Sequence, residues 1–193
     1  MESIILVEKI KNWIKAEKKL GSQEADSVVL ATASSKGEVH SRVVALREIT
    51  ESGLLFFTQK GSRKVKDLSE NPSASMTLWL ALQRREVVLD GVVELLNHNE
   101  NRRYWESLPR ERQLRFCVYK SGERIETLNH LQIDYEVLEK RYQDQSISMS
   151  ENYCGYRFIP SRIYFYCLGQ DSFSQVTQYI LNDGVWEEAI ISP

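Results

Sequence analysis

Three short segments decide how this chain folds: SRVVALR (41–47), FFT (56–58) and GSRK (61–64). The first two are rich in β-branched and aromatic residues, and the turn residues ESG (51–53) lie between them, so together they predict a β-hairpin. The third segment opens a short helix with a hydroxyl and two cations. The sequence therefore predicts two paired strands that lead directly into a helix N-terminus.

This arrangement indicates a site for a small phosphate-bearing ligand. It would gather Arg42, Arg63 and Lys64 near a helix N-terminus, where free backbone N–H groups and the helix dipole attract anions. Arginine offers phosphate oxygens a planar fork of donors, and lysine offers a point charge. The alternative is a solvated basic helix start that binds nothing.

The strand at 38–47 alternates, so its side chains fall into two sets. One face carries Arg42, Val44 and Leu46, and the other carries Val43, Ala45 and Arg47. Arg42 and Arg47 therefore need not touch the same part of a ligand.

Composition restricts the class of protein. The chain has 193 residues, of which 42% are hydrophobic, with a formal net charge of −2. This predicts one domain, over residues 1–193, and does not suggest nucleic-acid binding. The longest apolar runs are too short to span a bilayer, and the N-terminus lacks the pattern of a secretory signal, so we expect a cytoplasmic protein without membrane attachment. The three cysteines and three histidines show no metal-ligand spacing, and we expect no metal site.

Periodicity and turn residues predict many short strands with peripheral helices. Gly91 is expected to form a bulge, and Asn182-Asp183-Gly184 predicts a hairpin. The pattern predicts a mainly β fold, a closed or nearly closed barrel, with an N-terminal helix within 1–21 and a helical insertion over 97–145. Expected helices cover 3–19, 62–70 (with Ser62 as N-cap), 99–107 and 126–142, and expected strands cover 27–34, 38–47, 54–58, 74–82, 86–96, 153–159, 162–168, 175–181 and 185–191. Residues 110–124 are left unassigned.

Several motifs, in this order and spacing, resemble the pyridoxamine 5′-phosphate oxidase family, whose members are FMN-binding split β-barrels that act as homodimers. The likeness runs from about Val28 to Pro193. The motifs are RVVALR (42–47), FFT (56–58), GSRK (61–64), ENP (70–72), YWESLPR (104–110) and the C-terminal run 186–193.

The resemblance implies FMN as cofactor, with its phosphate and ribityl chain held by Arg42, Thr58, Arg63 and Lys64, and with Ser62 beside them. It places further cofactor contacts at Val43, Val44, Leu46, Arg47, Phe57, Glu86, Ser121 and Tyr166. It implies substrate contacts at Arg47, Tyr104 and Arg112.

Other positions depart from the family pattern. Arg47 replaces a lysine, Phe57 a tyrosine, Glu86 a glutamine and Tyr166 a tryptophan. Ser121-Gly122 stands where the family has Gln-Ser. Among the residues that bind the substrate phosphate in the family, Leu108 replaces an arginine and Arg112 replaces a serine. Arg112, together with Arg110 or Arg115, could restore the lost positive charge. Alternatively, these three arginines could form a solvated charged face. The run 172–176 (SFSQV) replaces the R-L-H-x-R run that grips substrate and flavin.

The resemblance implies an oxidase that moves a hydride from a small ring substrate to the flavin, with dioxygen as acceptor. Each charge-assisted hydrogen bond lost with the R-L-H-x-R run is worth about 1.5–3 kcal/mol. Losing two therefore implies that the transition state of the standard substrate is bound roughly a few hundred-fold or more weakly. Two alternatives therefore stay open. One is an FMN oxidoreductase on a different small molecule, like the phenazine-biosynthesis oxidases, and the other is a flavin-binding module without turnover.

Overall fold

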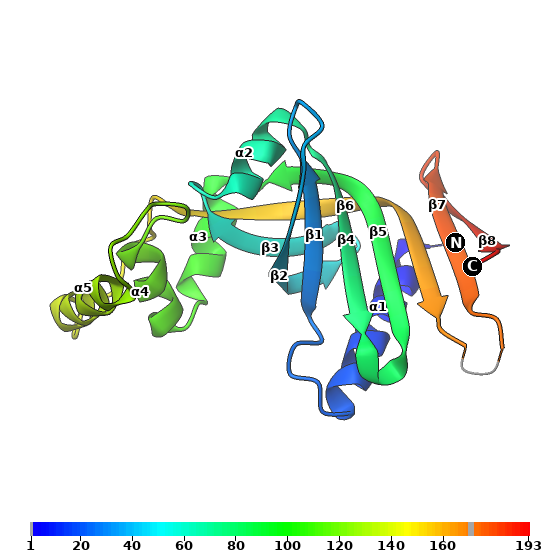
Figure 1. Cartoon of the computed structure of the whole chain (residues 1–193), viewed down its shortest axis with the longest axis horizontal. Helices are drawn as coiled ribbons and strands as arrows, with labels where there is room; N and C mark the ends of the chain where they lie inside the picture. The colour runs from blue at the N-terminus through cyan, green and yellow to red at the C-terminus, as the bar shows by residue number, and fades with distance from the viewer. Residues whose placement is uncertain (1, 170–171) are drawn as a thin grey trace.

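The computed structural model describes residues 2–169 and 172–193, and antiparallel strands dominate it (Figure 1). The hydrogen-bonded order of the strands is β3-β2-β1-β4-β5-β6-β7-β8. The elements are α1 (Ser3–Lys19), β1 (Ser27–Ala33), β2 (Val39–Thr50), β3 (Gly53–Gln59), α2 (Arg63–Glu70), β4 (Ser73–Leu80), the 3-10 turn η1 (Ala81–Gln83), β5 (Arg85–Leu95), α3 (His98–Glu106), α4 (Arg110–Val118), α5 (Leu128–Arg141), β6 (Tyr153–Cys167), β7 (Gln175–Asn182) and β8 (Val185–Ile191).

The sheet closes on itself because β3 also pairs with β6. Residues Leu54 to Gln59 run antiparallel to Tyr153 to Phe158. The six strands from β3 to β6 therefore form a closed barrel, and β7 and β8 extend the sheet beyond it. The prediction of a mainly β barrel with peripheral helices is confirmed.

The barrel interior is filled by the inward side chains of these strands. Leu30, Phe56, Met76, Leu89 and Phe158 have no exposed surface. Burial alternates along β1 and β5, as expected for strands with one face on a core. The barrel is thus a packed core, and any ligand must bind at its ends or on its outer face.

β6 is a single strand, whereas the sequence predicted two strands separated near Pro160. The irregularity is instead a bulge within β6, where Ser161 is the extra residue opposite Asp90 and Gly91 of β5. A side chain on Gly91 would clash with the carbonyl oxygen of Ile159, so glycine permits the close approach. A bulge does lie beside Gly91, but its extra residue belongs to β6 rather than to β5, and the predicted break in β6 is wrong.

The N-terminal helix is fastened to the barrel by a buried carboxylate. α1 has the predicted bounds and buries Leu6 and Ile10 against the barrel. Glu17 accepts hydrogen bonds from the backbone N–H groups of Leu82 and Gln83, at 2.8 and 3.1 Å. These bonds join α1 to the turn between β4 and β5, and Trp186 of β8 donates to Ser3 at the start of the helix.

The helical insertion lies at the opposite end of the long strand β6 from β7 and β8 (Figure 1). It has its own small core around Trp105, Leu114, Ile147 and Tyr153. α4 occupies residues that the sequence left unassigned. On the next helix, α5, helical spacing in the sequence predicts one apolar stripe made of Leu128, Leu131, Tyr135, Leu138 and Tyr142. The stripe is only partly observed, since Tyr135, Leu138 and Tyr142 pack against this core while Leu128 is 77% exposed.

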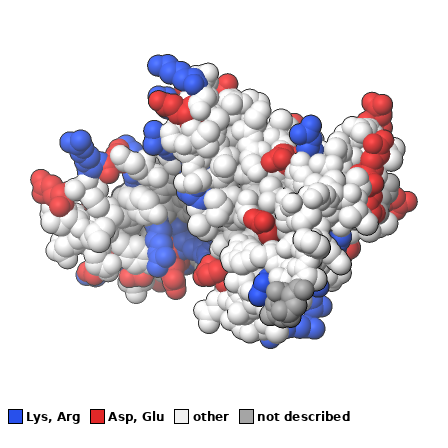
Figure 2. Space-filling view, turned by 45° about the vertical axis from the view of Figure 1, so that its right-hand side comes forward, with Lys and Arg blue, Asp and Glu red and all other residues white. Residues whose placement is uncertain are grey.

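Charge is mixed over the surface, in keeping with the formal net charge of −2 (Figure 2). Within the described residues, no helix is both long enough and apolar enough to cross a membrane.

Candidate functional site

Arg42 is held at one end of the barrel by its neighbours on β1. Its guanidinium donates to the carbonyl oxygen of Leu30 at 3.1 Å and to the hydroxyl of Thr32 at 2.8 Å. Val44 and Leu46, on the same face of β2, are buried, while Val43 and Arg47 are exposed. The predicted alternation along this strand is confirmed.

A buried carboxylate that the sequence analysis missed organises this region. Asp67 of α2 accepts a 2.6 Å hydrogen bond from Thr32, and His40 Nδ1 lies 3.0 Å from the same oxygen. Arg42 Nη2 lies 3.7 Å from it. Burial by itself would raise the pKa of the Asp67 carboxyl, but the hydrogen bonds from Thr32 and His40 and the adjacent positive charges hold it below its usual range. The sequence signal for Asp67 is its spacing of three residues from Lys64, on the same helix face.

The second half of this cluster comes from β3 and the start of α2. Lys64 Nζ donates to the hydroxyl of Thr58 at 2.9 Å, and that hydroxyl lies 3.4 Å from the hydroxyl of Ser62. Ser62 does occupy the N-cap position, but its side chain makes no capping hydrogen bond. Two hydroxyls and an ammonium group therefore meet where α2 begins.

The cations of this cluster are near enough to influence one another. Burial lowers the pKa of Lys64, and the charge of Arg42 lowers it further. Burial likewise lowers the pKa of Arg42; Asp67 opposes the shift and Arg63 adds to it. Like charges held together and partly desolvated are stabilised by a bound anion. The structure thus brings together the predicted phosphate residues, and their donors fit a phosphate group.

A cavity of about 340 Å³ lies between β2, β3 and the helical insertion. The three predicted substrate residues, Arg47, Tyr104 and Arg112, all line it. Its apolar walls include the rings of Phe57 and Tyr153, which stack with centroids 5.2 Å apart. The Tyr153 hydroxyl is buried and has no hydrogen-bond partner in the described part of the chain.

A bulge in β2 brings Arg47 to this cavity. The pairing of β2 with β3 shifts between Leu46 and Glu48, so Arg47 is the extra residue. The bulge places two consecutive side chains, Arg47 and Glu48, on one side of the strand. Glu48 accepts a hydrogen bond from the Tyr104 hydroxyl, and burial together with this bond raises the pKa of Tyr104. The sequence predicted that this strand ends at Arg47, but it continues to Thr50.

Other predicted residues lie elsewhere. Glu86 and Tyr166 face each other on β5 and β6, and Glu86 is also paired with the half-exposed Trp79. β1 and β4 separate Glu86 from Arg42 within one chain. The backbone N–H of Ser121 donates to the Gln59 side chain at 2.6 Å, which places Ser121 near the start of α2.

The arginines near Arg112 have different roles. Arg110 donates to the carbonyl oxygens of Gln145 and Tyr142, so it joins α4 to the chain that follows α5. Leu108 lines the cavity where the family has an arginine. No group of three or more potential metal ligands occurs in the range 2–169 or 172–193.

Comparison with known proteins agrees with this architecture. A family model described as pyridoxamine 5′-phosphate oxidase matches residues 8–142. A pyridoxine/pyridoxamine 5′-phosphate oxidase of Trichormus variabilis is 31% identical over 185 residues, which cover 95% of this chain and 86% of the relative. A chloroplastic relative of that name in Arabidopsis thaliana is 32% identical over 174 residues, which cover 90% of this chain and 33% of the relative.

Two solved structures share the fold. PhzG from Burkholderia lata, in complex with tetrahydrophenazine-1-carboxylic acid, superposes with a TM-score of 0.91 at 23% identity, covering 100% of this chain and 93% of that one. A pyridoxamine 5′-phosphate oxidase-related, FMN-binding protein from Nostoc punctiforme gives a TM-score of 0.79 at 19% identity, covering 96% of both chains. The fold is therefore the split β-barrel of FMN-binding proteins. The chain belongs to the pyridoxamine 5′-phosphate oxidase family.

The depressed pKa of Asp67 predicts a pH-dependent loss of stability. The folded state favours the ionised form of Asp67, so the ionised carboxylate adds to the free energy of unfolding. This contribution is present above the unfolded pKa of about 3.9 and is lost as the pH falls through the lower folded pKa. We expect Asp67→Asn to be less stable than the wild type at pH 7 by about 1.5–3 kcal/mol. That difference should shrink as the pH falls below about 4 in urea titrations.

The exposed carboxylate Asp144 provides the control. Asp144→Asn should change the free energy of unfolding by less than about 0.5 kcal/mol. A wild-type advantage over Asp67→Asn that stays constant down to pH 2 would contradict the assignment.

Proposed function

We propose that this chain binds FMN and acts as an oxidase on a small, negatively charged ring substrate. The observation that carries the proposal is the cation cluster: Lys64 donates to Thr58, whose hydroxyl lies near that of Ser62, while the charge of Arg42 acts on Lys64 and that of Arg63 on Arg42. The donor set suits a phosphate monoester, because its oxygens accept several charge-assisted hydrogen bonds at once. Family membership supports the same cofactor.

The remaining cofactor contacts proposed on β2 and β3 are of two kinds. Val44 and Leu46 are buried in the barrel, so they can offer a ligand only their backbone groups. Val43, Arg47 and Phe57 lie on the other side of their strands, with Val43 66% exposed. Phe57 and Thr58 are adjacent on β3, and strand alternation directs one to the cavity and the other to the cation cluster.

We propose that the chain acts as a homodimer. The outward side of the barrel exposes Val29, Val43 and Trp79 on adjacent strands. Apolar side chains grouped on a sheet face are typical of an interface. Glu86 and Tyr166 lie on this side, so a second copy would supply them to the cofactor of the first.

The cavity beside the cation cluster is proposed as the substrate site. Arg47 and Arg112 would hold the substrate's anionic group, and Tyr104, fixed by Glu48, would orient it. The rings of Phe57 and Tyr153 would exclude water from one wall. FMN supplies a hydride acceptor that dioxygen can reoxidise. The protein's part is therefore to position the substrate.

The identity of the ring compound is a second question. Phosphorylated vitamin B6 and a carboxylated, partly reduced phenazine both have the required charge and shape. The run 172–176 has no cation, and Phe173 is 89% exposed, which favours a substrate other than the B6 phosphates. A flavin-binding module without turnover is the remaining alternative.

Lys64→Ala tests the cofactor site. Removing one charge-assisted contact should weaken FMN binding about tenfold to a hundredfold, as measured by flavin fluorescence titration. Lys66→Ala removes an exposed cation from the same helix and should leave the affinity within about twofold. Equal affinities for the two variants would refute the phosphate assignment.

Val43→Glu tests the dimer. A charge placed in the centre of the exposed apolar face should produce a monomer in sedimentation velocity and weaken FMN binding, because the partner's residues are lost. Val137→Glu makes the same change at an exposed position of α5 and should leave the mass unchanged. A wild-type protein that sediments as a monomer would also refute this part of the proposal.

Arg112→Ala tests the substrate site. Peroxide release from the FMN-loaded protein is measured with pyridoxine 5′-phosphate and with a dihydrophenazine carboxylate. With whichever compound turns over, Arg112→Ala should lower kcat/KM by about tenfold to a hundredfold. Arg102→Ala, at an exposed ion pair of α3, is the control. Bound FMN without peroxide from either compound favours the module without turnover.

A further inference from the structure

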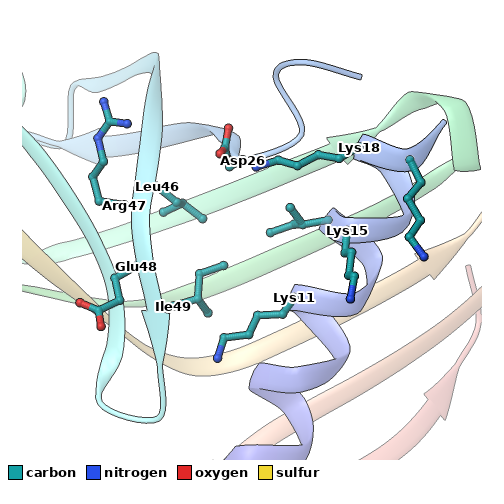
Figure 3. Close-up of a pocket in the computed structure, with 10 residues that line it drawn as sticks. Lys11, Lys15, Lys18, Asp26, Leu46, Arg47, Glu48 and Ile49 are labelled. Atoms are coloured by element: carbon teal, nitrogen blue, oxygen red, sulfur yellow. Dashed lines mark hydrogen bonds and ion pairs between the residues drawn. The ribbon is translucent and has the colours of Figure 1, made fainter. Parts of the chain in front are cut away.

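A separate groove lies between α1 and β2, away from the cation cluster (Figure 3). Its volume is about 530 Å³, within the range of about 300–1,000 Å³ typical of small-molecule sites. Ile14 of the helix and Leu46 and Ile49 of the strand form its apolar floor. Figure 3 shows Leu46 and Ile49 directed toward the helix, while Arg47 and Glu48 point away from it.

Lysines border this floor along the helix. Lys11, Lys15, Lys18 and Lys19 all line the groove, with a spacing that keeps them on one side of α1. Lys18 and Lys19 lie in the last turn, where cations complement the helix dipole. The dipole does not account for Lys15 and Lys11, which lie about one turn and two turns earlier.

The acidic residues around the groove do not balance this charge. Asp26 pairs with Lys18 at 2.8 Å, and Glu48 is engaged by Tyr104 on the other side of the strand. Lys11 pairs with Glu8 at 3.1 Å, where both side chains are solvated, so that ion pair is weak. Lys15 has no ion pair within the described residues. The groove therefore combines unbalanced positive charge with an apolar floor in which Ile49 is partly exposed and Ile14 and Leu46 are nearly buried.

We propose that this groove binds a small anion with a flat apolar body, such as an aromatic phosphate monoester. The floor of Ile14, Leu46 and Ile49 would take the apolar body, and Lys15, with Lys11 and Lys18, would take the anionic group. Lysines suit this role because their flexible stems bring a point charge to an anion without a fixed geometry. Arg47 borders both this groove and the proposed substrate cavity, but the other residues of the two sites differ, and the proposed cofactor site lies at α2.

Isoleucine methyl NMR tests the proposal with phenyl phosphate as probe. Saturable shifts are expected at the methyl groups of Ile14 and Ile49, and none at Ile147 in the core of the helical insertion. Inorganic phosphate, which lacks the apolar body, and benzyl alcohol, which lacks the charge, should each bind at least about tenfold more weakly. Absence of saturable shifts at Ile14 and Ile49 would overturn the proposal.

Three variants locate the site. Lys15→Glu should weaken phenyl phosphate binding at least about tenfold, while Lys36→Glu, the same change in the turn between β1 and β2, should leave it unchanged. Arg42→Gln, in the cation cluster, should keep the shifts at Ile14 and Ile49. Equal effects of the Lys15 and Lys36 changes, or loss of those shifts in Arg42→Gln, would overturn the proposal. The Arg42 result also separates this groove from the FMN site.

Discussion

The geometry of the cation cluster depends on one buried carboxylate. Asp67 draws Thr32 and His40 to a single oxygen, and Thr32 in turn accepts a hydrogen bond from Arg42. A buried charge is tolerated only when it is paired and hydrogen-bonded. The carboxylate belongs to α2, and its partners belong to two strands of the barrel, β1 and β2. The same carboxylate therefore orients the arginine and fixes the helix over the sheet. The stability of the fold and the geometry of the site depend on one group.

Much of the architecture could be predicted from local patterns. Alternation along β1 and β5, the turn residues before β8 and the helical spacing in α1 each depend on nearby residues, and they gave elements close to those observed. The meeting of Thr58, Ser62 and Lys64 could be predicted because these residues lie close together in the chain, in a turn and the first turn of a helix, so little else determines where they meet.

Features that depend on distant parts of the chain were missed. Asp67 pairs with residues 27 and 35 positions away, and nothing in its local sequence shows that its side chain is buried. β6 continues past Pro160 because its extra residue, Ser161, is accommodated as a bulge opposite β5. The apolar stripe of α5 lacks a surface to cover Leu128, so its helical periodicity overstated its burial. Glu86 and Tyr166 were placed by family pattern alone, and one chain does not bring them to Arg42.

The bulge at Arg47 changes the phase of β2. Before it, even-numbered positions such as Val44 and Leu46 face the core; after it, the odd-numbered Ile49 takes that direction. Deleting Arg47 would restore regular pairing with β3 and keep Leu46 and Ile49 on the core side, because Arg47 and Glu48 both point away from that side (Figure 3), but the cavity would lose the Arg47 guanidinium. The extra residue therefore alters only one surface of the strand: it adds a cation to the cavity without moving the apolar side chains on the opposite side.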